Sequence, residues 1–339
     1  MKRFIITNLL AAMVLPMLAC AGGWTSNYYL FRIYDAQEFS ERVQKICNDN
    51  WKAYLGKSPD DWYWFDSDDI IEFAQKKGDA LMVSYAKNLE LYLNCARSVS
   101  NERWEYPSKE ELAARNKLLA NVRTYAQSKL KSKLRSQHAL LYMRCNMLLA
   151  KHQENVTFWE ETASQYIETV YKDMMKNIYA GALYKTGRSA EAGELFAEMG
   201  DYNSLMTQYY KKRSFAAIRQ EYLSNPNAKV LPFLLQDFVN NAQEADDAIR
   251  YEGQFGGKLF IRDISKKEAL DMRDFCKQVV KEGKTEVPIM WQSAQAWIEF
   301  MFGDKRQAAS DIIAAAKLNG TELMKNSTLG REAFLERTV

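Results

Sequence analysis

Two histidines, His138 and His152, are the only imidazoles available for acid–base catalysis or metal binding. They are 14 residues apart, which corresponds to roughly 21 Å along a continuous helix, so they cannot share one metal ion. The sequence contains neither H-E-x-x-H nor C-x-x-C, the spacings that commonly bind zinc. A serine–histidine–acid site can assemble from distant residues, but no G-x-S-x-G motif supports one. We therefore expect no metal, no cofactor and no catalytic residue, and we assign both histidines to helix surfaces or to hydrogen bonds between helices.

Loops that bind phosphate or calcium are also missing. The glycines between Gly253 and Gly257 have neither the lysine nor the preceding strand of a phosphate-binding loop. Five aspartates lie between Asp60 and Asp69, but an EF-hand would need an acid or asparagine at position 70 and a glycine at 71, where Ile70 and Ile71 stand. These acids are typical of helix capping and solvation, with a loose calcium site as the alternative.

Four cysteines follow the first 21 residues: Cys47, Cys95, Cys145 and Cys276. An even number of cysteines in an exported protein permits disulfides. Each of the four, however, lies in an apolar helical context far from the others in sequence. This pattern favours buried free thiols, with one disulfide as the alternative.

The composition is that of a folded helical protein. Of the 339 residues, 47% are hydrophobic and 13% aromatic, which is enough for a sizeable core. Six prolines and 15 glycines are few for an all-β chain of this length, so long helices are favoured. The net charge of +3 results from 46 basic and 43 acidic residues, and such a balance gives no field that would recruit nucleic acid.

Residues 1–21 have the pattern of a secretion signal. Lys2-Arg3 precede the apolar run Phe4–Leu18, which is too short to span a membrane, and small residues end it. Ala19–Ala21 is an A-x-A cleavage site that would release a soluble periplasmic or secreted protein. Alternatively, Met17–Cys20 resembles a bacterial lipobox, which would attach lipid to Cys20 and make an outer-membrane lipoprotein. Under both alternatives we expect an exported protein with no membrane contact other than a lipid anchor.

The segment Lys176–Gly200 predicts two helices that meet at a turn. Small residues let two helix axes approach, and large residues fill the groove between them. The positions that we assign to this packing are Ala180, Leu183, Gly187, Ala192 and Phe196. These positions resemble the small, glycine and aromatic positions of a tetratricopeptide (TPR) motif.

A second window, Gln292–Lys317, has the same arrangement with Ala296, Gly303, Ala308 and Ile312 at the corresponding positions. The two turn glycines are 116 residues apart. That distance is not a multiple of the TPR period of about 34 residues, but it fits three units of roughly 39. The resemblance implies an irregular array of stacked hairpins, and an ordinary helical bundle is the alternative.

We therefore predict an all-α protein, an irregular TPR-like α-solenoid of helical hairpins. Residues 22–106 form an aromatic-rich N-terminal helical region, and 107–339 form the repeat array. The array ends without an obvious polar capping repeat, which suggests truncation at its C-terminal end or a continuing partner. Within the array, the patterns predict one helix from Ser108 to about Lys133, a second over Asn155–Met174 and a third over Val230–Asn241. The overall layout resembles uncharacterised exported proteins of Bacteroidetes-type bacteria, and that resemblance implies no activity.

Six aromatic residues near the N-terminus are the candidate ligand-binding side chains: Trp51, Tyr54, Trp62, Tyr63, Trp64 and Phe65. Exposed, their rings would suit a sugar or a peptide. Packed, they would close the end of the helical array.

These observations predict recognition of a protein or peptide partner in the cell envelope. Glycan binding is the second hypothesis, because sugar-binding outer-membrane lipoproteins of the SusD type are similar in being helical, TPR-containing and tethered. An envelope enzyme without a recognisable motif is the third.

Overall fold

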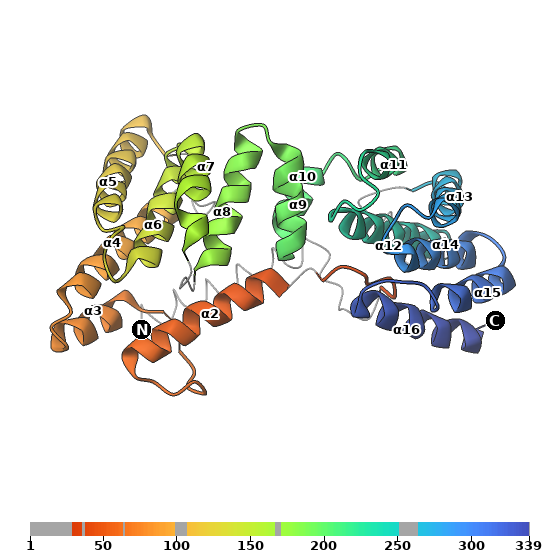
Figure 1. Ribbon diagram of the computed structural model, residues 1–339, viewed down its shortest axis with the longest axis horizontal. Helices are drawn as coiled ribbons and strands as arrows, with labels where there is room; N and C mark the ends of the chain where they lie inside the picture. The colour runs from red at the N-terminus through yellow and green to blue at the C-terminus, as the bar shows by residue number, and fades with distance from the viewer. Residues whose placement is uncertain are drawn as a thin grey trace. The chain divides into compact units, whose positions relative to one another are not determined.

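The computed structural model describes residues 29–35, 38–63, 65–98, 107–166, 171–250 and 264–338. These ranges contain 15 α-helices, one short 3-10 helix and no β-strand, which confirms the all-α fold (Figure 1). The chain forms two compact units. We call residues 35–211 the inserted unit, and the described residues 29–34 with 212–338 the terminal unit.

The helices of the inserted unit are α2 (Glu38–Leu55), α3 (Ser67–Lys76), α4 (Ala80–Arg97), α5 (Lys109–Ser128), α6 (Arg135–Leu148), α7 (His152–Glu161), η1 (Ala163–Gln165), α8 (Lys172–Lys185), α9 (Ser189–Met199) and α10 (Tyr202–Tyr209). From α3 to α10, each α-helix packs against the next. In addition, α4 packs on α6 and α6 on α8, so these three helices share one face. This pattern is compatible with stacked hairpins, and the solenoid itself stays a prediction.

The terminal unit contains α11 (Phe215–Ser224), α12 (Leu231–Arg250), α13 (Lys266–Glu282), α14 (Pro288–Phe302), α15 (Lys305–Ala315) and α16 (Glu322–Thr338). An extended segment, residues 29–34, completes it. The backbone nitrogens of Ile33 and Tyr34 donate to Gln236 Oε1 at 2.6 and 2.8 Å, and Arg331 Nη1 donates to the Leu30 carbonyl at 2.9 Å. The start of the described chain is therefore fastened to α12 and α16.

The predicted repeat-packing residues are buried in both hairpins, which are α8–α9 and α14–α15: Ala180, Leu183, Ala192 and Phe196 in the first, Ala296, Ala308 and Ile312 in the second. The two turn glycines differ in backbone conformation and in surroundings. Gly187 has φ +91°, a left-handed conformation that side chains avoid. Gly303 has φ −131°, but a Cβ there would lie 2.1 Å from a carboxylate oxygen of Glu299.

Three helix ends differ from the predicted ones. The helix that follows Ser108 ends at Ser128, and beyond it the Ser132 hydroxyl accepts from the Leu134 nitrogen, a local bond that competes with the helical pattern. The single helix predicted over Asn155–Met174 is two helices: α7 ends at Glu161, and α8 begins at Lys172. In contrast, α12 continues past Asn241 to Arg250, because no glycine or proline interrupts it.

Candidate functional site

A pocket of about 330 Å³ opens in the inserted unit, between α2 and the face that α4, α6 and α8 share. Four helices provide its lining: Phe39 and Val43 from α2, Tyr92 from α4, Arg144, Met147 and Leu148 from α6, and Met174, Asn177 and Ile178 from α8. On α6 and on α8 the lining residues follow the same spacing, i, i+3 and i+4, which places them on one side of each helix. We call this cavity the Arg144 pocket.

Among the described residues, Arg144 is the only charged side chain that lines the pocket. It is half-buried, with Nη2 at 3.6 Å from the Met174 sulfur and the guanidinium carbon at 5.9 Å from the centre of the Tyr92 ring. No carboxylate of the described residues forms an ion pair with it. Its guanidinium therefore has donors available for an anionic group, in surroundings that are mostly apolar.

Two further polar side chains line the pocket beside Arg144. Burial raises the pKa of the Tyr92 hydroxyl, while the positive charge of Arg144 opposes that rise, so Tyr92 keeps its proton. Asn177 donates through Nδ2 to Asp201 at 2.6 Å, a contact that orients its amide. The pocket thus combines a cation, a hydroxyl and an amide with a methionine- and leucine-rich wall.

Helix α2 lies beside this pocket, and its two lining residues, Phe39 and Val43, are only half-buried. Arg42 pairs with Asp173 of α8 at 3.3 Å, but both side chains are more than a third exposed. The Cys47 sulfur lies 4.0 Å from the Met174 sulfur. Among the side chains of α2 that the structure describes, only Trp51 is buried. An amphipathic helix thus covers part of the α4–α6–α8 face without being sealed into a core.

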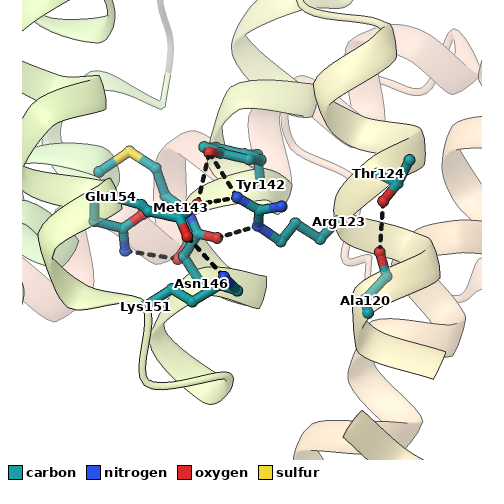
Figure 2. Close-up of polar contacts among 9 residues, drawn as sticks. Ala120, Arg123, Thr124, Tyr142, Met143, Asn146, Lys151 and Glu154 are labelled. Atoms are coloured by element: carbon teal, nitrogen blue, oxygen red, sulfur yellow. Dashed lines mark hydrogen bonds and ion pairs between the residues drawn. The ribbon is translucent and has the colours of Figure 1, made fainter. Parts of the chain in front are cut away.

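The opposite side of α6 carries a closed polar network (Figure 2). Arg123 of α5 donates to Asn146 Oδ1 at 2.5 Å and to the Tyr142 hydroxyl at 3.1 Å, and it pairs with Glu154 of α7. Asn146 in turn donates through Nδ2 to Asn155 Oδ1. Because its members satisfy one another, we assign this network to holding α5, α6 and α7 together, which keeps the pocket wall rigid.

The cysteines and His138 lie among the packed helices. All four cysteines are free thiols, and Cys47 alone is not fully buried. His138 is buried: its Nδ1 lies 2.8 Å from the Leu134 carbonyl and its Nε2 lies 3.3 Å from the Tyr125 hydroxyl of α5. Burial lowers its pKa, and the Leu134 carbonyl opposes that decrease. In the part of the chain that the structure describes, no group of three His, Cys, Asp or Glu side chains is placed to hold a metal ion.

The predicted aromatic ligand-binding residues divide into core and surface. Trp51 and Tyr63 are both 8% exposed, and the Trp51 ring lies 5.2 Å from that of Phe65. Tyr54 is half-buried, with its ring 5.6 Å from the ring of Phe73 in α3. In contrast, Trp62 is 83% exposed.

The remaining candidates of the sequence analysis have no described structure. Trp64, the lipid-attachment candidate Cys20 and the signal at 1–21 all lie outside the described residues, as does the glycine loop Gly253–Gly257.

Sequence reasoning missed the Arg144 pocket. One signal was present, because Arg144 is a lone charge within the apolar run Ala139–Leu149. That signal identifies an unusual arginine, but only the fold brings Tyr92 and Asn177 to the same cavity.

Comparisons with family models, with curated proteins and with solved structures find no match to this chain. Among the helices that the structure describes, none combines the length and apolarity that crossing a membrane requires.

Proposed function

We propose that this protein is a helical recognition module of the cell envelope whose α4–α6–α8 face binds an amphipathic helix of a partner protein. The observation that carries the proposal is the placement of α2. A helix already lies on that face, only one of its described side chains is buried, and a pocket remains open beside it. Grooves of this kind bind helices through apolar side chains spaced three and four residues apart.

The lining chemistry supports a peptide ligand over a sugar. The walls contain methionine, leucine and isoleucine, which adapt to apolar side chains. A sugar platform needs several exposed rings together, whereas Trp62 alone is highly exposed among the described members of the aromatic segment. Stacking as a TPR-like solenoid is part of the proposal, and contacts between helices two apart in sequence support it.

A photo-crosslinking amino acid at Ile178, which lines the pocket, tests the proposal in the cells that produce the protein. The matched control carries the same group at Leu118 of α5, which is 46% exposed and does not line the pocket. We expect a discrete protein adduct from Ile178 only, suppressed by a synthetic peptide of residues 38–55. Equal adducts from both positions, or no adduct from Ile178, would contradict the proposal.

The envelope location is supported by residues 1–21, with their basic start, apolar run and small residues before Cys20. We expect fractionation to find the protein outside the cytoplasm. Labelling with radioactive palmitate distinguishes the two processing routes: a lipoprotein loses its label in Cys20→Ala, and a soluble exported protein is never labelled. Recovery in the cytoplasm would contradict both routes.

A further inference from the structure

We infer that the Arg144 pocket recognises an acidic side chain of the bound helix, a glutamate or aspartate at the position that Val43 occupies in α2. This inference rests on the proposed function and adds the chemistry of the partner. Arg144 and Val43 line the same cavity, so a helix that follows the path of α2 brings that position into the cavity that the guanidinium lines.

The charge of Arg144 points to an acidic ligand. No carboxylate in the described ranges neutralises it, although it is half-buried. Its present neighbours are a methionine sulfur and an aromatic ring, which are weak substitutes for a carboxylate. The protonated Tyr92 hydroxyl lines the pocket with it and adds a neutral donor, whereas the Nδ2 of Asn177, which also lines the pocket, already donates to Asp201. A carboxylate is the group that this donor set fits.

The apolar lining around Arg144 favours a carboxylate on a protein side chain over a small free anion. Apart from those three polar side chains, every lining residue that the structure describes is apolar. A small, strongly hydrated anion gains nothing from Met147, Leu148 or Ile178. An acidic side chain with apolar neighbours on the same helix uses both parts of the lining, and partial exclusion of water strengthens its hydrogen bond to Arg144.

Helix α2 lines the pocket without an acidic side chain among its described lining residues. It places Phe39 and Val43 in the pocket, so the guanidinium stays unpaired while α2 is bound. One ion pair between α2 and α8, formed by Arg42 and Asp173, is exposed at both ends, and such pairs contribute little. A partner helix with an acid at the Val43 position therefore makes a contact that α2 cannot make.

The first test needs no partner. In the full-length protein, Val43→Glu supplies the missing carboxylate in α2, and Val43→Gln is the neutral control of the same size. We expect hydrogen exchange of the α2 amides to be about tenfold slower with Glu than with Gln, a ratio within reach of one charge-assisted hydrogen bond. The difference should disappear in Arg144→Gln and persist in Arg144→Lys. Equal exchange of the Glu and Gln variants would overturn the inference.

The second test uses fluorescent peptides of residues 38–55 that carry the same two substitutions. The receptor needs its own α2 to be loosened, and we use point variants for this. Truncation from the N-terminus would also remove residues 29–34, which belong to the terminal unit. The receptor is the full chain with Phe39→Ala and Arg42→Ala, with and without Arg144→Gln. We expect the Glu peptide to bind with a Kd about tenfold lower than the Gln peptide, only when Arg144 is present.

The outcomes of the peptide test separate the two proposals. If both peptides bind with equal Kd, the acidic preference is wrong and helix binding on this face stands. If neither peptide binds the loosened receptor, helix binding fails, and the acidic preference fails with it.

Discussion

Asn155 of α7 is buried and forms hydrogen bonds to α6, so we expect its replacement to destabilise the inserted unit. Its Nδ2 donates to the Met143 carbonyl at 2.9 Å, and its Oδ1 accepts from Asn146 Nδ2 at 2.9 Å. Both asparagines are fully buried. Asn155→Leu keeps the number and branching of the side-chain heavy atoms but removes both hydrogen bonds, so polarity is lost without a cavity being created.

The magnitude follows from what the substitution leaves behind. One lost hydrogen bond contributes about 1 kcal/mol, and the amide donor of Asn146 that is left buried without a partner costs about 1–3 kcal/mol more. We therefore expect Asn155→Leu to lower the free energy of opening by about 2–4 kcal/mol. Native-state hydrogen exchange of the α6 and α7 amides measures it without requiring the two units to unfold together.

A surface substitution on the neighbouring helix provides the control. Thr124 Oγ1 donates to the Ala120 carbonyl at 2.9 Å on the exposed side of α5 (Figure 2), and Thr124→Ala should change the opening free energy by less than about 0.5 kcal/mol. In the double variant Asn146→Leu plus Asn155→Leu, no orphaned amide remains, so the combined cost should be smaller than the sum of the single costs. An additive double variant, or a cost of Asn155→Leu no larger than the control, would refute this account of the network.

Three further predictions concern packing and pH. Burial holds the pKa of folded His138 below its ordinary 6.5, so the unfolded chain takes up that proton first as the pH falls; stability should decrease below about pH 6.5, and His138→Gln should flatten the dependence of Tm on pH. A Cβ at Gly193 would lie 2.5 Å from the Tyr209 hydroxyl, so Gly193→Ala should cost about 1–3 kcal/mol in thermal denaturation, whereas Gly330 in α16 has open space and Gly330→Ala should stabilise by about 0.5–1 kcal/mol. Trp51→Ala should cost about 3–5 kcal/mol by the same measurement, because Trp51 is buried, and a near-zero cost would show that α2 is not anchored there.

Local patterns predicted much of the fold. The capping box at Ser108 and Glu111 is present, and the small residues Ala180 and Ala192 are buried where two helices meet. These features depend on neighbours within a few residues, which a sequence displays directly. The break between α7 and α8 was not predictable in the same way, because the apolar spacing continues beyond Glu161, where the helix α7 ends.

The candidate site was predictable only in part. The aromatic residues near Trp51 attracted attention by type, but type does not tell a packed ring from an exposed one, and Trp51 is buried where Trp62 is exposed. Arg144 could be recognised as unusual from its apolar surroundings in sequence. Its lack of a carboxylate partner is a property of three-dimensional packing, which no spacing rule contains.

The fastening of Leu30 by Arg331 has a consequence for how the chain is synthesised. Residues 35–211 precede α16 in the chain, so the inserted unit can complete its contacts first, whether the chain emerges from the ribosome or from an export channel. Residues 29–34 must wait for their partners, on the order of tens of seconds at ordinary elongation rates. Phe31 and Ile33 are buried in the folded protein, but during that interval their packing partners are absent. We expect chaperones that bind apolar segments of newly made chains to bind this segment.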